Sequence, residues 1–337
     1  MKQVDKTTCN SLLYTKHISE YIKHKKSQGY KMEATLDVLC RFNKFAISLG
    51  ETQIGISKEL MDKWGRRLPT ETECNRYNRI STVRRFSCHL QLVGYDSYIP
   101  KLPRFISTYT PYIFTKEEIA HIFSECDKLL VMGNFPRSVK NMIPALIRVL
   151  YGTGIRISEA LNLTHSDVDL NDGFLHLREC KNNHERIVPL SMSVRDVCKE
   201  YVMYKQNLGL AIDSNEPFFT SAKGERGAKN SIYAIFRIVL HRANIPHQGR
   251  GKGPRLHDLR HTFCVNALVK LSEKGLDLYY SLPILMTYMG HRSINSTNKY
   301  VRLTEELYPY LIKKVNKAYQ HVLPNLYSNT NSEYEND

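Results

Sequence analysis

The sequence contains no long uninterrupted apolar run. Its most apolar stretch, residues 142–155, includes Arg148 and falls short of the roughly 20 apolar residues that cross a bilayer. The first residues are basic, but they lead into Thr-Thr-Cys-Asn rather than into the apolar core of a signal peptide. We therefore expect a cytoplasmic protein with neither a membrane span nor a secretory signal.

Cysteines are few, and none lies close enough in the sequence to another to form a C-x-x-C pair. The eight cysteines lie far apart along the chain, and no C-x-x-C pair occurs. In a chain of this length, such spacing is typical of reduced and mostly buried thiols. It argues against a disulfide framework and against a cysteine zinc site.

Acidic residues are too few to balance the basic ones. The 337 residues include 48 Lys plus Arg and 33 Asp plus Glu, which gives a formal net charge of +15. Hydrophobic residues make up 42% and charged residues 24%, a composition that excludes collagen-like and largely disordered chains. The positive charge favours a polyanionic partner, and the lack of a membrane segment makes nucleic acid the better candidate.

Prolines separate two parts of unequal charge. Pro100, Pro103 and Pro111 lie close together, and because proline disfavours helix, we expect an extended linker there. Residues 1–105 hold 19 basic and 10 acidic side chains, whereas residues 106–337 hold 29 and 23. We predict a basic helical domain, a linker, a second domain and a polar tail, over residues 1–100, 101–110, 111–323 and 324–337.

The apolar pattern predicts a mainly α fold with a small three-stranded antiparallel sheet (α+β). Apolar residues at three-and-four spacing indicate helices within residues 15–97. Thr115 and Glu118 have the spacing of a capping box, flanked by Phe114 and Ile119 as a hydrophobic staple, so a helix is expected to begin there. The elements expected next are helices over 116–130 and 137–151, strands over 168–170, 174–178 and 186–190, and further helices beyond residue 193.

Two groups of basic residues are candidates for contact with nucleic acid. One group lies in the first domain, and the other in a glycine-rich loop before residue 256. The members are Arg76, Arg79, Arg84 and Arg85 in the first group, and Arg250, Lys252 and Arg255 in the second. A charge run of this kind is either a solvated surface or a set of phosphate contacts, and the sequence leaves both open.

The first motif whose side chains could take part in binding or catalysis is G-T-G-I-R-I-S-E over residues 152–159. Two glycines break the chain, and a helix is expected to begin near Arg156. Glu159 lies three residues further on, so its carboxylate can orient the guanidinium. Taken alone, the pair is better explained as a surface ion pair of a few tenths of a kcal/mol.

The second motif is L-H-D-L-R-H-T over residues 256–262. His257 and Arg260 lie one helical turn apart, and an imidazole beside a guanidinium suits an anionic ligand such as phosphate. His257 and His261 also have zinc-ligand spacing. However, the metalloprotease pattern requires Glu where this chain has Asp258, so no metal site is expected.

The third motif is G-H-R-S-I-N-S-T-N-K-Y over residues 290–300. Gly290 is expected to close an apolar helix over residues 282–289, and Ser293 can cap the next helix. Tyr300 would lie on that next helix, where its phenol can converge with the imidazole of His291 on one ligand.

Together, the three motifs resemble those of the tyrosine recombinases, also called phage-integrase-type recombinases. The resemblance covers most of residues 111–302 and rests on G-x-G-x-R-x-S-E, L-H-D-L-R-H-T and G-H-x-S-I-x-x-T-x-x-Y in this order. Residues 15–97 are similar to the family's core DNA-binding domain. Lys181 matches the lysine that the family places in the turn between the second and third strands.

The resemblance implies cleavage and rejoining of DNA strands through a 3′-phosphotyrosine, without a metal or nucleotide cofactor. It implies that Tyr300 attacks the scissile phosphate, while Arg156 and Arg260 bind the oxygens of this phosphate. His291 would add a hydrogen-bond donor to the same phosphate, and Glu159 would orient Arg156. Lys181 would protonate the leaving 5′-oxygen, and His257 would assist removal of the phenol proton. The implied partners are double-stranded DNA at specific core sites and further copies of the chain, as a tetramer on DNA. A bacterial, phage or mobile-element context, including transposition, is expected.

Two other functions stay open at this point. A type IB topoisomerase would use the same chemistry without pairing two sites. A noncatalytic DNA-binding protein would keep the scaffold, although binding alone does not require a nucleophile. The C-terminal residues 304–319 are expected to form an amphipathic helix, which would pack either on its own domain or on a neighbouring protomer.

Overall fold

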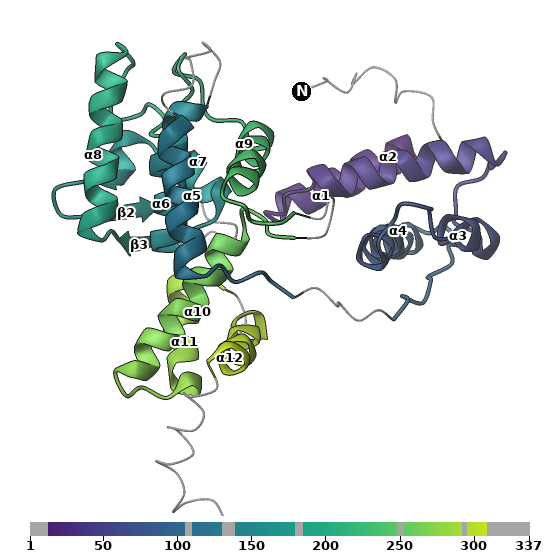
Figure 1. Ribbon diagram of the computed structural model, residues 1–337. Helices are drawn as coiled ribbons and strands as arrows, with labels where there is room; N and C mark the ends of the chain where they lie inside the picture. The colour runs from purple at the N-terminus through teal and green to yellow at the C-terminus, as the bar shows by residue number, and fades with distance from the viewer. Residues whose placement is uncertain are drawn as a thin grey trace, which may run out of the picture. The chain divides into compact units, whose positions relative to one another are not determined.

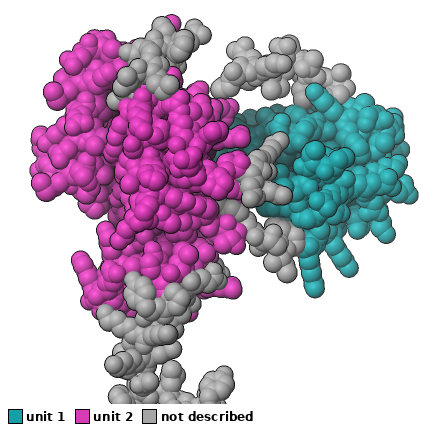
Figure 2. Space-filling model, in the orientation of Figure 1, with its two compact units in different colours: residues 1–109 teal, residues 110–337 magenta. Residues whose placement is uncertain are grey.

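The structure, a computed structural model, describes residues 13–104, 110–129, 139–178, 185–247, 253–291 and 295–308. The chain divides into two compact units, residues 1–109 and 110–337 (Figure 2). The division falls within the proline-containing stretch where the linker is expected. Each unit has its own apolar core and is considered separately.

The first unit is helical in its described part (Figure 1). Its helices are α1 (Thr15–Ser27), α2 (Glu33–Ser48), α3 (Lys58–Trp64) and α4 (Glu73–Leu92). Helices α1, α2 and α4 contact one another around Tyr14, Leu39, Phe42, Phe86 and Leu90, which are all fully buried. The helical prediction for residues 15–97 is therefore confirmed.

The second unit combines helices with one small sheet in its described part. The helices are α5 (Lys116–Lys128), α6 (Ile143–Thr153), α7 (Ile157–Asn162), α8 (Met192–Asn207), α9 (Lys229–Arg242), α10 (Asp258–Glu273), α11 (Leu278–Met289) and α12 (Asn295–Leu307). Strands β1 (Val168–Asp169), β2 (Phe174–Leu177) and β3 (Arg186–Pro189) pair antiparallel in the order β1-β2-β3. The predicted fold class is confirmed.

Helix α6 is the central helix of the main core in the second unit. Leu146, Ile147 and Leu150 are almost wholly buried, and α5, α8 and α10 all contact this helix. A helix with so large an apolar surface is stable only when other elements cover it. Gly154 follows at φ +64°, in the left-handed region, and ends the helix. The chain of the first motif therefore leaves the buried helix α6 at Gly154.

A second core joins α10, α11 and α12, which form a group at one end of the unit (Figure 1). Leu268, Leu282 and Val301 are buried between these helices, and Tyr300 belongs to the same cluster. Helix α11 begins at Leu278, four residues earlier than expected. The reason is that the Asp277 carboxylate caps it, accepting hydrogen bonds from two backbone N–H groups of the first turn.

The start of α5 shows the predicted capping box. The Thr115 hydroxyl accepts a hydrogen bond from the Glu118 N–H at 3.2 Å, and the Glu118 carboxylate accepts one from the Thr115 N–H at 2.9 Å. Phe114 and Ile119, on either side, are both buried in the main core. This confirms that a folded unit begins here.

Several expectations fall on residues that lie outside the described ranges. These are the turn at residues 181–183, the cap at Ser293 and the C-terminal helix beyond residue 308. Among the residues that are described, no helix has the length and apolar character needed to cross a membrane.

We predict that Thr115→Ala lowers the free energy of unfolding of the second unit by about 1 kcal/mol, because the N-terminal N–H groups of α5 lose their acceptor. Urea denaturation of the full chain measures this change. Thr115→Ser keeps the hydroxyl and serves as the control. Equal stability of the Ala variant and the wild type would show that the capping box contributes nothing.

Candidate active site

The three sequence motifs meet at the buried guanidinium of Arg260. One of its nitrogens donates to the carbonyl of Gly154 at 2.6 Å, and the other donates to the carbonyl of Met289 at 2.8 Å. The second nitrogen also lies 3.0 Å from Nε2 of His291. The side chain is almost wholly buried, and although this burial lowers the pKa of Arg260 to about 10, the group stays charged at neutral pH.

Two left-handed glycines make these contacts possible. Gly154 and Gly290 have φ values of +64° and +62°, and they end α6 and α11. A Cβ atom on Gly154 would lie 2.5 Å from the ring of Phe263, so any larger residue would clash there. The ends of both helices can therefore approach Arg260 closely.

Arg156 and Glu159 form the pair that the first motif predicts. Arg156 precedes the first residue of α7, its N–H donates to the Glu159 carboxylate at 2.8 Å, and its guanidinium donates at 2.7 Å. The Glu159 side chain is buried. Burial acts to raise the pKa of Glu159, but hydrogen bonds from Arg186 and Arg156 outweigh it and hold the pKa below its usual value. The group is therefore a carboxylate.

Arg186 is a part of this cluster that sequence reasoning missed. Its guanidinium donates to Glu159 at 2.8 Å from β3, so Glu159 bridges two arginines. The one indication in the sequence was that Arg186 follows shortly after Lys181, which the resemblance assigns to the active site.

The hydroxyl of Tyr300 points into the protein in this structure. It hydrogen-bonds Nδ1 of His261 at 2.8 Å, and only 1% of Tyr300 is exposed. Burial, aided by the nearby Cys264 thiol, raises the pKa of the phenol, so the hydroxyl keeps its proton and donates to His261. The rings of Tyr300 and His291 stack with centroids 6.4 Å apart, which agrees with the expected convergence.

His261 is therefore a second residue that sequence reasoning missed, since its only expected role was the rejected zinc site. The imidazole that contacts the phenol is His261, whereas the sequence points to His257. His257 is more exposed and packs edge-on against His261, with centroids 4.9 Å apart. Nε2 of His261 lies 4.0 Å from the Asp258 carboxylate.

The imidazole of His291 is held from both sides. Arg260 donates to its Nε2, so Nδ1 carries the proton and donates to the Thr297 hydroxyl at 2.9 Å. Burial and the Arg260 charge lower the pKa of His291 to about 4. Burial and neighbouring cations likewise lower the pKa of His257 to about 4 and that of His261 to about 3. All three rings are neutral at pH 7.

The remaining eight of the fourteen candidate residues lie apart from this cluster or outside the described residues. Lys181, Arg250 and Lys252 fall outside the described residues. Arg255 is exposed, and its backbone N–H donates to the Asp258 carboxylate at 2.7 Å, just before α10.

In the first unit, Arg79 is turned inward. It is 5% exposed, donates to both oxygens of Glu71 at 2.8 and 2.7 Å, and lies over the ring of Trp64. Its charge is thus neutralised inside the unit, which is a structural role and not the phosphate contact that the sequence suggests. Of the other members, Arg76 donates to the Gly65 carbonyl, Arg84 is half-buried and Arg85 is exposed.

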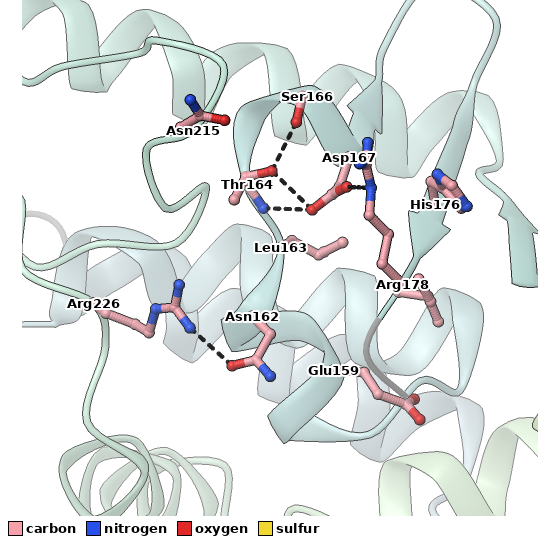
Figure 3. Close-up of a pocket in the computed structure, with 11 residues that line it drawn as sticks. Glu159, Asn162, Leu163, Thr164, Ser166, Asp167, His176, Arg178, Asn215 and Arg226 are labelled. Carbon is pink, nitrogen blue, oxygen red and sulfur yellow. Dashed lines mark hydrogen bonds and ion pairs between the residues drawn. The ribbon is translucent and has the colours of Figure 1, made fainter. Parts of the chain in front are cut away.

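A polar cavity of about 340 Å³ lies beside Glu159 (Figure 3). Asn162, Asp167, Arg178 and Arg226 are on its walls, and Arg178 is paired with Asp167 at 2.6 Å. The described residues that line it do not include Arg260 or Tyr300. A separate space next to Arg260 and His257 measures only about 10 Å³ among the described residues.

Residues 113–306 match the phage integrase family, and this segment contains all three motifs. The chain therefore belongs to the phage integrase family and is a tyrosine recombinase.

Relatives of this class match the chain over most of its length. The Sinorhizobium fredii protein y4rB, described as an integrase/recombinase, is 27% identical over 306 residues, which are 90% of this chain and 97% of that protein. The tyrosine recombinase XerC of Oceanobacillus iheyensis is 30% identical over 235 residues, covering 68% of this chain and 70% of XerC.

Solved structures of recombinases share the fold at lower identity. The XerH site-specific recombinase, bound to a palindromic difH substrate, superimposes with a TM-score of 0.59 at 18% identity, covering 84% of this chain and 76% of XerH. The Tn1549 transposon integrase, in complex with a circular intermediate DNA, gives 0.60 at 17% identity, covering 86% of this chain and 95% of the integrase.

We predict that the second unit loses stability as the pH falls from 7 to 5. The unfolded imidazoles, with pKa values near about 6.5, bind protons in this range, whereas the folded rings of His257, His261 and His291 do not until about pH 4 or below. Because the unfolded state binds more protons, stability rises with pH in this window, by up to about 1.4 kcal/mol per pH unit for the buried ring of His261 and by less for the more exposed rings of His257 and His291.

Urea denaturation at pH 7 and pH 5 measures this slope. His261→Gln removes one of the three rings and should flatten the slope relative to the wild type. A slope that is the same in both proteins would contradict the neutral, buried state of His261.

Proposed function

We propose that the chain is a site-specific recombinase that cleaves and rejoins DNA strands through a covalent 3′-phosphotyrosine on Tyr300. The observation that carries this proposal is the meeting of Arg156, Arg260, His291 and Tyr300 from three distant motifs around one buried guanidinium. Fixed positive charge beside a tyrosine hydroxyl suits attack on a phosphodiester.

The chemistry needs a nucleophile, neutralisation of the phosphoryl oxygens and two proton transfers. The phenol of Tyr300 loses its proton and its oxygen forms a bond to phosphorus, while the bond from phosphorus to the 5′-oxygen breaks and the released 5′-oxygen takes up a proton to become a hydroxyl. Arg156 and Arg260 neutralise the non-bridging oxygens, with His291 as a further donor. Lys181, which lies between β2 and β3 in the sequence, supplies the proton to the 5′-oxygen.

The phenol proton has two candidate acceptors. His261 already contacts the hydroxyl, and His257 packs against His261. Since the hydroxyl is buried and hydrogen-bonded to His261, it has to leave this contact before it can reach a phosphate. Burial keeps the nucleophile protonated until that contact breaks.

The reaction conserves bond energy, because a phosphodiester is exchanged for a phosphotyrosyl ester of similar stability. Rejoining to another strand therefore requires neither ATP nor a metal ion. The proposed partners are duplex DNA with specific core sites and three further copies of the chain. Residues 1–100 would contact DNA as a basic domain, through residues such as Arg84 and Arg85, while residues 111–323 cut the strand.

We predict that the wild-type protein, incubated with a nicked duplex that carries its selected site, forms a covalent DNA adduct at Tyr300. The nick allows the short cleaved strand to diffuse away, so the intermediate accumulates. Tyr300→Phe should form no adduct because it lacks the nucleophile, and gel shift followed by peptide mass spectrometry measures this.

Tyr201→Phe is the matched control, since Tyr201 is also a buried tyrosine with a hydrogen-bonded hydroxyl, on α8. An adduct in the Tyr300→Phe protein would overturn the nucleophile assignment. Tight site-specific binding without any adduct would favour the noncatalytic protein. Relaxation of supercoiled plasmid without joining between sites would favour the topoisomerase.

We further predict that Arg260→Lys slows adduct formation by about 10²–10³-fold while DNA binding changes little. Lysine keeps the charge, but it cannot reach both the Gly154 and the Met289 carbonyls with a planar fork. Single-turnover cleavage at saturating protein measures the rate. A rate within threefold of the wild type would contradict the role of the guanidinium.

A further inference from the structure

Arg186 is the first residue of β3 and points toward the candidate active site. Its side chain is 12% exposed. One guanidinium nitrogen lies 2.8 Å from Oε2 of Glu159, and the other lies 3.4 Å from Oε1. This two-pronged pair links the sheet to α7 across 27 residues of sequence.

Both oxygens of Glu159 are shared between two arginines. Oε1 also accepts from the Arg156 guanidinium at 2.7 Å, and Oε2 also accepts from the Arg156 N–H at 2.8 Å. The carboxylate is therefore held in one plane by contacts from both sides. Loss of either arginine would leave a buried carboxylate with half of its partners.

The cavity next to Glu159 explains why a second arginine is needed. Glu159 lies at one edge of this polar space of about 340 Å³ (Figure 3). Without Arg186, the carboxylate could rotate toward the cavity and away from Arg156. Arg178, on the same wall, offers no substitute, because its guanidinium is already bound to Asp167 at 2.6 Å.

Arg186 also packs against the third motif. A Cβ atom placed on Gly290 would lie 3.1 Å from one guanidinium nitrogen of Arg186 and 3.5 Å from its central carbon. The guanidinium therefore sits directly on the backbone that precedes His291. One side chain thus contacts the segment that orients Arg156 and the segment that presents His291.

We propose that Arg186 is a positioning residue for strand cleavage, which holds Glu159 so that Glu159 aims Arg156 at the phosphate. This inference rests on the proposed function, because its effect is read through cleavage. Arg186 acts through Glu159 and is not assigned a contact with the reacting atoms.

The test compares Arg186→Met with Arg148→Met in the full-length protein on the nicked duplex. Arg148 makes the same kind of two-pronged pair, which joins α6 to Asp127 of α5 at 2.8 and 2.7 Å. We expect Arg186→Met to slow single-turnover cleavage by about 10²-fold at saturating protein, because a small misplacement of a clamping group has an effect of this size. Its DNA affinity should stay within threefold of the wild type, and Arg148→Met should leave both quantities within threefold.

A double-mutant cycle with Glu159→Gln identifies the route. If Arg186 acts through Glu159, the double variant cleaves no more than threefold slower than the slower single variant. Multiplied losses would overturn the inference, because they would show an independent effect. Arg186→Lys, which keeps the charge and one contact, should recover part of the lost rate but still cleave more slowly than the wild type.

Two failures can be told apart. If the wild type itself forms no adduct at Tyr300, the proposed function is overturned. If the wild type cleaves and Arg186→Met cleaves as fast as Arg148→Met, only the role of Arg186 is overturned. Should Arg186→Met lose cooperative thermal unfolding, Arg186→Lys decides: slowed cleavage at unchanged affinity supports the role, and an unchanged rate refutes it.

Discussion

The contact on which the rest of the site depends is the hydrogen bonding of the buried Arg260 guanidinium to two helix ends. By donating to the Gly154 and Met289 carbonyls, this one side chain fixes α10 relative to α6 and α11. A buried guanidinium is costly unless its donors are satisfied, so helix ends that lack partners for their carbonyls are well suited to receive it. The same contacts place Arg156, on one side, and His291, on the other, beside a common centre.

Electrostatics then gives this centre an unbalanced positive charge. Arg156, Arg186 and Arg260 converge, while Glu159 is the carboxylate that their hydrogen bonds engage. The neighbouring imidazoles are neutral at pH 7, because burial and the arginine charges lower their pKa values. A phosphodiester would supply the missing negative charge, so the site is electrostatically incomplete until DNA is bound.

Local spacing allowed much of the fold and part of the site to be predicted. Helical periodicity, the Thr115 capping box and the turn residues indicated the helices and the sheet, because these depend on neighbours a few residues apart. The Arg156–Glu159 pair, three residues apart at the start of α7, was visible for the same reason. The contact of His261 with Tyr300 spans 39 residues, and it depends on how α12 packs on α10, which no local pattern reveals. Arg79 shows the opposite error, since a charged residue in a basic run suggested exposure while Glu71 neutralises it inside the unit.

The central claim is that three motifs form one phosphate-binding centre with Tyr300 as its nucleophile. The most direct measurement is a crystal structure of the full chain on a gapped duplex with vanadate at the cleavage position. We predict that vanadium bonds to the Tyr300 oxygen and that Arg156 and Arg260 contact the equatorial oxygens. The Tyr300 oxygen should then no longer be hydrogen-bonded to His261. A vanadate bound elsewhere, with Tyr300 still hydrogen-bonded to His261 on the DNA complex, would contradict it.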